Sequence, residues 1–343
     1  MPSTLSQNTL HALLARLYGQ PDTWLHLKFR VLPGGLESSN VVQVTGTFQD
    51  ARGGWSRVSL VVKHLRGSAV REASVYQRLV TVHAGSLSPR LIATEQAGTN
   101  QVVLYLEALR PYMRWPWQDT RLAGQVLEHL ARLHTASVDR ETRAGLTDWD
   151  YEAELRSSSE STLELLRLST GSDSPLQSLK WALPSVRRIV LALPEVRRQL
   201  LQFRPYGRVA IHGDMHPGNV VVRWKSGVLE AAILDWGRAR IGSPLEDVSS
   251  WLQSLGYWEP EARRRHDTLL VQYLRSRGAD PRLLPEFRAA YWLAGASNAL
   301  SGALRYHLSL ATDNRRSRAQ RFRAIASARD WLRVLRRADA CWI

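Results

Sequence analysis

The amino-acid sequence predicts an α+β protein of two lobes, a small antiparallel β lobe with one helix followed by a larger, mainly helical lobe. The chain has 343 residues, and single hydrophobic cores stop growing beyond roughly 250–300 residues. Apolar residues recur with a period of two in much of the first third of the chain, but with a period of 3.6 beyond Pro111. We therefore expect one domain at 1–108 and a second at 109–343.

The first lobe is expected to be a sheet with one helix packed on it. Leucines at helical spacing predict a short helix near the N-terminus. The glycine pairs Gly34-Gly35 and Gly53-Gly54 separate three runs of alternating residues. Helical spacing over 69–82 predicts the helix. The strands are expected at 25–32, 41–48, 57–65, 90–95 and 101–107.

Six segments with a helical period make up most of the second lobe. They cover 121–137, 151–168, 176–204, 260–277, 284–309 and 315–338. The segment Val209–Asp235 interrupts them, because its β-branched runs flank a Ser226-Gly227 turn and so predict a hairpin. This hairpin carries the richest polar cluster of the sequence.

The composition limits the function classes. The net charge of +15 attracts anions, but net charge is an argument about association and not about fold, and it favours nucleic acid only weakly. A single cysteine, Cys341, excludes an internal disulfide and favours a reducing cytoplasm. No signal peptide is readable, and no run of about 18 apolar residues predicts a membrane span.

The polar cluster consists of Ile211-His212-Gly213-Asp214-Met215-His216-Pro217-Gly218-Asn219-Val220, followed by Leu234-Asp235-Trp236-Gly237. Phosphoryl transfer needs a carboxylate to accept the proton of the attacking hydroxyl, and oxygen ligands for Mg²⁺ at the nucleotide phosphates. Asp214 and Asn219 lie five residues apart on one loop, and Asp235 ends a strand. These three residues therefore predict a base and two metal ligands.

The order His212, Asp214, Asn219 and Asp235-x-Gly237 is that of the protein-kinase catalytic segments. This stretch resembles the aminoglycoside phosphotransferase and choline kinase-like family, whose signature is H-G-D-x-H-x-x-N followed by an I-x-D-W strand end. The segment Leu130–His134 resembles the helix end that precedes the catalytic loop in that family. The resemblance implies a two-lobed protein-kinase-like fold and an ATP- and Mg²⁺-dependent transfer to a small-molecule hydroxyl.

The resemblance also implies roles for single residues. Asp214 would be the catalytic base or the group that orients the hydroxyl, and His216 would face the transferred phosphoryl group. Asn219 and Asp235 would hold Mg²⁺. His212 is expected to brace the loop. Asp247 matches a position that anchors the loop, and it also fits an acid at a helix N-terminus.

The first lobe supplies candidates for nucleotide binding. Lys63 ends an apolar run and would contact the phosphates, with Glu72 as its ion-pair partner. Both also fit a solvated lysine and a surface glutamate, because nine residues is a short separation for this pair. Gly34-Gly35 resembles the hairpin that covers the phosphates, or is only a turn. The segment Glu107-Ala108-Leu109 would bind the adenine through its main chain.

Other interpretations stay open at this stage. A small-molecule acceptor is expected, either an aminoglycoside-type antibiotic or a metabolite such as an amino alcohol or a sugar. The acids at 148–154 and Glu246, Asp247, Glu259 and Glu261 would line a pocket for a polycation, or they are helix starts. Rival hypotheses are a metal hydrolase that uses His-x-Asp-x-His, a catalytically silent nucleotide-binding module, and a basic nucleic-acid-binding protein. The arginine-rich segment 315–337 fits a solvated helix face, or a surface that binds an acidic acceptor or a partner.

Overall fold

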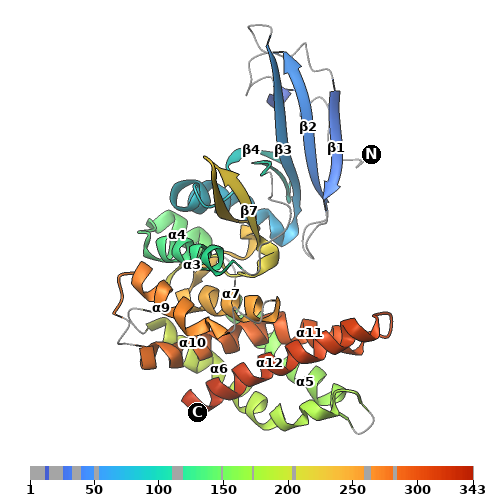
Figure 1. Ribbon diagram of the computed structural model, residues 1–343, viewed down its shortest axis with the longest axis vertical. Helices are drawn as coiled ribbons and strands as arrows, with labels where there is room; N and C mark the ends of the chain where they lie inside the picture. The colour runs from blue at the N-terminus through green and yellow to red at the C-terminus, as the bar shows by residue number, and fades with distance from the viewer. Residues whose placement is uncertain are drawn as a thin grey trace. The chain divides into compact units, whose positions relative to one another are not determined.

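The chain divides into two compact units, Met1–Tyr112 and Met113–Ile343 (Figure 1). The computed structural model describes residues 12–14, 26–32, 40–49, 54–109, 119–147, 150–171, 174–202, 206–258, 264–280 and 284–342. The first unit contains an antiparallel sheet and the second is mostly helical. The predicted α+β class with a β-rich first lobe is confirmed.

The first unit contains a sheet of five strands in the order β1-β2-β3-β5-β4, in which every neighbouring pair is antiparallel. The strands are β1 (His26–Leu32), β2 (Asn40–Gln49), β3 (Trp55–Arg66), β4 (Leu91–Gly98) and β5 (Gln101–Glu107). All five lie where the alternating pattern predicts them. Figure 1 shows β1, β2 and β3 side by side, with β3 longer than its predicted range of 57–65.

One face of this sheet forms a hydrophobic core. Alternate residues of each central strand contribute to it, because successive side chains of a strand point to opposite faces. The buried members are Leu13, Leu14, Val42, Val44, Val58, Leu60, Val62, Val103 and Tyr105. Residues 12–14 are helical and two of them belong to this cluster, so the leucines of the predicted N-terminal helix serve as core residues.

The helix after β3 is longer than the predicted 69–82 and irregular. It runs through η1 (Gly67–Val70), α2 (Arg71–Val75) and η2 (Tyr76–Ala84). The hydroxyl of Thr81 donates to the carbonyl of Tyr76, five residues earlier, as expected for a helix that widens to the π form. Its buried side includes Glu72 and the predicted apolar residues Ala73, Tyr76, Leu79 and Val80.

The second unit consists mainly of helices. Those at predicted positions are α3 (Thr120–Thr135), α5 (Tyr151–Ser169), α6 (Leu183–Gln202), α9 (His266–Ser276), α10 (Leu284–Asn298), α11 (Leu304–Thr312) and α12 (Arg318–Trp342). The 3-10 turn η3 (Gln177–Ala182) precedes α6, and η7 (Ala299–Ala303) joins α10 to α11. The prediction of one helix over 284–309 is wrong in detail, because Gly302 has a φ of 155° and breaks the helical path.

Two further helices, α4 (Arg140–Thr147) and α7 (Pro244–Trp258), were not predicted as periodic segments. In α7 the apolar residues over 244–255 are buried, and so are the charged residues Glu246 and Asp247. Leu245, Val248, Trp251, Leu252 and Leu255 recur at helical spacing, whereas Ser250, Gln253 and Ser254 are only partly buried, so the segment has a periodic signal that the prediction missed. The segment packs against α10, which also packs against α12. Most arginines of α12 are exposed, as expected for a solvated face.

Short strands interrupt the helices at the predicted position. They are β6 (Val209–Ile211), β7 (Val220–Lys225), β8 (Val228–Ile233) and β9 (Arg240–Gly242). Strands β7 and β8 form the predicted hairpin, and its turn residues Ser226 and Gly227 have φ values of 52° and 80°, the geometry of a tight hairpin turn. Strand β6 pairs with β9, which the sequence did not predict.

Helix α3 covers the edge of strand β8 with two side chains. The side-chain oxygen of Gln125 accepts from the N–H of Ala231 at 2.7 Å, and Nε2 of His129 donates to the carbonyl of Ala231 at 3.1 Å. An uncovered strand edge would leave these main-chain groups without partners. The same two bonds fix the β7–β8 hairpin against α3.

The buried His129 predicts a dependence of stability on pH. Desolvation, with a smaller contribution from the Arg132 charge, lowers the pKa of His129 from 6.5 to about 4. Between these values the unfolded chain binds a proton that the folded chain excludes, so the free energy of unfolding decreases as the pH falls through this window. In His129→Gln, which retains a donor for Ala231, the loss between pH 7 and pH 5 should be smaller by about 2 kcal/mol. Urea titrations at both pH values measure this difference, and equal losses in both proteins would contradict it.

Candidate active site

The loop between β6 and β7 is built around a glycine that no other residue can replace without displacing atoms. Gly213 has a φ of +83°, and a Cβ there would lie 2.2 Å from the carbonyl oxygen of Arg238 and 2.3 Å from the NH1 atom of Arg240. The loop ends in the 3-10 turn η4 (Pro217–Asn219), where Nδ1 of His216 accepts from the N–H of Gly218 at 3.0 Å. These constraints fix the backbone on both sides of Asp214.

Asp214 and Asn219 are in direct contact. The amide nitrogen of Asn219 donates to Oδ2 of Asp214 at 3.2 Å and to its main-chain carbonyl at 2.9 Å. Nε2 of His216 lies 3.7 Å from Oδ2 of Asp214, and the side chains of these two residues are 41% and 42% exposed. Asn219 is buried. The loop therefore exposes the carboxylate of Asp214 and the imidazole of His216 to solvent. The buried amide of Asn219 holds the Asp214 side chain by a hydrogen bond.

His212 has the bracing role expected from the sequence. Its side chain is buried, Nε2 donates to the carbonyl of Leu234 at 2.8 Å, and Nδ1 accepts from the N–H of Asp214 at 3.2 Å. Its ring contacts that of Trp236 edge-on, with 4.7 Å between the centroids. His212 thus joins the loop to the end of strand β8 and has both ring nitrogens engaged in that task.

Asp235 follows that strand end in a strained conformation. Its φ of 60° lies in the left-handed region, which costs an ordinary residue of the order of 1 kcal/mol or more. Among the described non-glycine residues, positive φ occurs here and at Ser226 in the hairpin turn. The N–H of the preceding Leu234 donates to the carbonyl of Asn219 at 2.8 Å. The two predicted metal ligands therefore lie on segments that are hydrogen-bonded to each other.

The charges of the loop are coupled. Burial opposes ionisation of Asp214, but the adjacent imidazole of His216 and the charges of His212 and Arg238 outweigh it and lower its pKa. Burial likewise opposes the protonation of His216, but Asp214 and Asp235 raise the pKa of this imidazole above its usual value. Asp214 is therefore ionised at neutral pH and able to accept a hydrogen bond from a hydroxyl.

Asp247 anchors the loop from the first turn of α7. Its Oδ2 accepts from the main-chain N–H of His212 at 2.7 Å, and its Oδ1 from that of Gly213 at 2.8 Å. Nε2 of His134 donates to Oδ2 at 3.1 Å, while Nδ1 of His134 accepts from the hydroxyl of Tyr273 at 2.8 Å. Both expectations for Asp247 hold, since it is a loop anchor and an acid near a helix start. The sequence did not indicate the contact with His134 and Tyr273.

In the first unit, Nζ of Lys63 lies 2.6 Å from Oε2 of Glu72, and the two side chains are 10% and 3% exposed. The interpretation as a solvated lysine and a surface glutamate is therefore wrong. The nine-residue separation suffices because β3 leads directly into the helix that carries Glu72. The binding of phosphates by this pair stays a prediction.

The other predicted nucleotide contacts lie at the end of β5 or outside the described residues. The main-chain N–H of Glu107 donates to the carbonyl of Arg90 at 2.9 Å, and that of Ala108 to the carbonyl of Ser59 at 3.3 Å. Leu109 is the last described residue of this segment. Gly34 and Gly35 belong to the residues that the structure does not describe.

The acids considered for a polycation pocket are engaged in ion pairs and caps. Asp150 caps α5 by accepting from the N–H of Ala153 at 3.0 Å. Glu152 lies 3.6 Å from Arg197, Glu154 pairs with Arg238, and Glu246 is fully buried between two arginines. The remaining members, Asp148, Glu259 and Glu261, lie outside the described residues.

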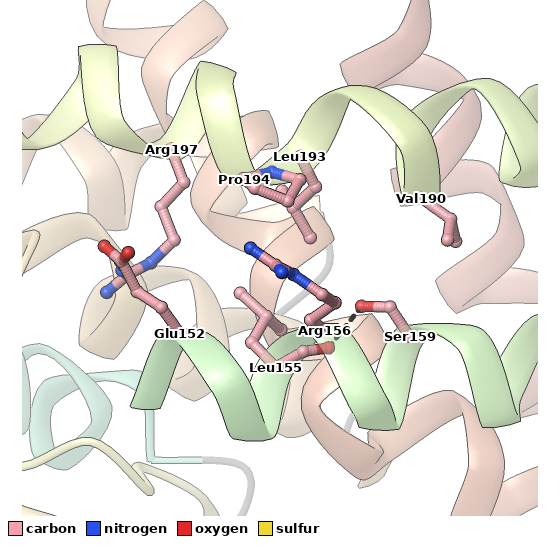
Figure 2. A pocket seen from close by; sticks show the side chains of 8 residues that line it. All are labelled: Glu152, Leu155, Arg156, Ser159, Val190, Leu193, Pro194 and Arg197. Atoms are coloured by element: carbon pink, nitrogen blue, oxygen red, sulfur yellow. Dashed lines mark hydrogen bonds and ion pairs between the residues drawn. The ribbon is translucent and has the colours of Figure 1, made fainter. Parts of the chain in front are cut away.

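A small pocket lies between α5 and α6 (Figure 2). It encloses about 300 Å³ including its open side. Its lining consists of four apolar and four polar residues: Leu155, Val190, Leu193, Pro194, Glu152, Arg156, Ser159 and Arg197. None of the residues predicted for catalysis or metal binding contributes to this pocket.

The described residues do not support the rival metal-hydrolase site. They contain no group of three or more His, Cys, Asp or Glu side chains arranged to hold a metal ion. Of the two histidines after Asp235, His266 bonds to the hydroxyl of Tyr291 at 2.8 Å and stacks on Trp292, while His307 lies in α11. Among the helices within the described ranges, none is both long and apolar enough to span a membrane.

Comparison with solved structures identifies the fold. Choline kinase from Cryptosporidium parvum Iowa II superposes with a TM-score of 0.61 and 10% identity, over 96% of this chain and 95% of that one. Plasmodium vivax ethanolamine kinase superposes with a TM-score of 0.57 and 11% identity, over 96% of this chain and 89% of that one. For the spectinomycin phosphotransferase in complex with ADP and spectinomycin they are 0.51 and 16%, over 99% of both chains. The expected kinase-like fold is confirmed.

Sequence comparison tests the resemblance carried by the catalytic loop. No curated protein sequence matches this chain. The sequence pattern of the phosphotransferase enzyme family matches residues 28–292, which is more than half of the chain and includes the loop at 212–219 and Asp235. Both the sequence pattern and the fold thus agree with the geometry of the loop, and the chain belongs to the phosphotransferase enzyme family.

Proposed function

We propose that this protein transfers the γ-phosphoryl group of ATP, in the presence of Mg²⁺, to a hydroxyl of a small molecule. The observation that carries the proposal is the loop at 212–219, which holds Asp214 in an ionised, solvent-accessible state and in direct contact with Asn219. The family contributes the reaction type, phosphoryl transfer. The relatives that act on choline, ethanolamine or spectinomycin support a small acceptor.

The residues of the loop define the steps that the protein performs. Asp214 accepts a hydrogen bond from the acceptor hydroxyl, orients its oxygen towards the γ-phosphorus, and takes its proton as the new P–O bond forms. The bond from this phosphorus to the β,γ-bridging oxygen breaks, and ADP leaves with the electron pair. Because the pKa of Asp214 is lowered, its carboxylate is ionised at neutral pH and available to accept this hydrogen bond. His216, next to Asp214, would face the transferred phosphoryl group and offset part of its charge.

The donor set of the loop fits Mg²⁺, which prefers oxygen ligands. The amide nitrogen of Asn219 is committed to Asp214, so its amide oxygen would be the ligand atom, together with a carboxylate oxygen of Asp235. When bound, the ion neutralises charge on the β- and γ-phosphates. The strained φ of Asp235 supports a functional assignment, because such strain persists mainly where a function requires it.

In the first unit, the buried ion pair of Lys63 and Glu72 supports a role in nucleotide binding. An ammonium held by a carboxylate at 2.6 Å has a fixed position and can act as a point charge towards α- and β-phosphates. The N–H groups of Glu107 and Ala108 are used within the sheet. The carbonyl of Glu107 and the N–H of Leu109 would then bind the adenine edge, while Gly34 and Gly35 would cover the phosphates.

The charges around the loop favour a metabolite as acceptor over a polycationic antibiotic. The described acids of the two acidic groups are already paired with arginines, a histidine or main-chain N–H groups. Glu246 and Asp247 are fully buried, so their use by a polycation would break buried ion pairs at a large cost in free energy. An amino alcohol, a sugar or a similar hydroxyl compound meets no such requirement.

The role of Asp214 predicts the effect of one substitution. Asp214→Asn removes the proton acceptor but keeps the size of the side chain, so MgATP turnover should fall by about a hundredfold or more. The measurement is ADP release, with and without acceptor. Asp267→Asn is the matched control, since Asp267 is 65% exposed and lies in the same unit. Turnover by Asp214→Asn at the level of this control would refute the assigned role.

The metal assignment predicts a change in ligand-induced stability. Asparagine tolerates the left-handed conformation that Asp235 adopts, so Asp235→Asn should fold normally but bind Mg²⁺ less well. MgATP should raise the melting temperature of the wild type more than ATP with EDTA does. We expect the variant to lose this Mg²⁺-dependent increment and to keep the increment from ATP alone. Equal Mg²⁺-dependent increments in both proteins would exclude Asp235 as a ligand.

The acceptor class is tested with a panel of hydroxyl compounds that includes amino alcohols, sugars and aminoglycosides. ADP release above the acceptor-free background is expected with a compound of the first two groups and not with the aminoglycosides. Turnover of an aminoglycoside would show that the paired acids do not decide the acceptor. Binding of MgATP without turnover on any compound would favour a catalytically silent module, and salt-sensitive binding to an oligonucleotide would favour the nucleic-acid alternative.

A further inference from the structure

A buried cluster of charges lies next to the catalytic loop, and the reaction described above does not use it. Glu246 of α7 contacts two arginines: its Oε1 accepts from Nε of Arg197 at 2.7 Å, and its Oε2 from NH2 of Arg240 at 2.9 Å. The side chains are 0%, 4% and 3% exposed. The guanidinium groups lie 4.8 Å and 3.8 Å from the ring centroid of Tyr151.

This arrangement is a poor device for stability alone. One carboxylate faces two buried guanidinium groups, and burying such charges costs more free energy than packing apolar residues of similar size. The aromatic ring of Tyr151 and the half-exposed Glu152, which points towards Arg197 across the pocket in Figure 2, compensate only part of this charge. The cluster therefore requires an explanation in addition to packing.

The second guanidinium nitrogen of Arg240 supplies that explanation. NH1 donates to the carbonyl oxygen of Gly213 at 3.0 Å and lies 3.4 Å from that of Arg238. The carbonyl of Gly213 belongs to the peptide bond that precedes Asp214. The N–H of the same peptide bond donates to Nδ1 of His212 at 3.2 Å. Both polar atoms of this peptide are thus held, and its plane decides where the Cα–Cβ bond of Asp214 points.

We infer that Arg240 is a positioning residue for Asp214, and that Glu246, supported by Arg197, holds its guanidinium group against the carbonyl of Gly213. This inference rests on the proposed function, in which Asp214 orients the acceptor hydroxyl. The planar fork of an arginine suits this task, because two of its nitrogens can bind two different acceptors at fixed positions. Neighbouring residues of α7 therefore hold the loop from two sides: Asp247 binds its N–H groups directly, and Glu246 holds its carbonyl through Arg240.

Three variants separate positioning from stability. Arg240→Met removes the bond to Gly213, Arg240→Lys can bind Gly213 or Glu246 but not both in the same geometry, and Arg197→Met disturbs the cluster but leaves Arg240 on the loop. We expect hydrogen exchange in the peptide that spans 209–219 to accelerate by about tenfold or more in Arg240→Met. The acceleration should be smaller in Arg240→Lys, and within about twofold of the wild type in Arg197→Met.

The kinetic readout follows the same order. The kcat for MgATP turnover should fall by about tenfold in Arg240→Met with little change in KM for ATP, because a misplaced Asp214 affects the reaction and not nucleotide binding. Arg240→Lys should recover part of the loss. Arg188→Met is the surface control, since Arg188 is 52% exposed and pairs with Asp339 in the same unit, and it should match the wild type in both measurements.

The outcomes distinguish this inference from the proposed function. If Arg240→Met and Arg197→Met lose the same melting temperature and change exchange and kcat equally, Arg240 is only structural and the inference is wrong. If Asp214→Asn retains full turnover, the proposed function fails, while hydrogen exchange still shows whether Arg240 holds the loop. If Arg240→Met does not fold, Arg240→Lys and Glu246→Gln replace it in the test. Unchanged hydrogen exchange at 209–219 in both variants would overturn the inference.

Discussion

The candidate site depends on one buried carboxylate. Asp247 accepts three hydrogen bonds, from the N–H groups of His212 and Gly213 and from the imidazole of His134. An ionised carboxylate only accepts hydrogen bonds, so it can bind all three donors. An amide in its place would bring its own N–H donors against one or more of them. Desolvation opposes the charge of Asp247, but these bonds outweigh it and keep its pKa below the usual value. The backbone of the loop is fixed, because a buried carboxylate requires hydrogen-bond donors and the loop supplies two of them.

The loop separates its buried side chains from its exposed ones. His212, Asn219 and Asp247 are buried and hold backbone groups, whereas Asp214 and His216 reach solvent. Gly213 and Asp235 adopt positive φ at the two sides of the loop, which is typical of functional segments whose conformation is imposed by their surroundings. A carboxylate that binds a substrate must be exposed to solvent. Its position must then be fixed by neighbouring residues that are buried.

The arginine-rich composition has a structural use within the second unit as well as an effect on net charge. Arg197 and Arg240 are buried against Glu246, and Arg238 pairs with Glu154 next to the loop. Glu154 and Glu246, which the sequence suggested as part of a surface for a cationic acceptor, are therefore already paired with arginines. In this part of the described chain, a count of charges would therefore mislead about binding, because the pairing of each charge and not the total decides the local potential.

The sequence by itself determined the features that depend on near neighbours. Alternation and glycine pairs predicted the strands, the β-branched runs around Ser226-Gly227 predicted the hairpin, and five residues of one loop brought Asp214 and Asn219 together. Tertiary structure alone decided the pairs distant in sequence: His134 with Asp247 and Tyr273 at separations of 113 and 139 residues, and Arg197 with Glu246 at 49. It also decided that Glu246 and Asp247 of α7 are buried, although both are charged. The spacing of neighbouring residues can be read from the sequence. The partners of a buried charge are determined only by the packing of the helices.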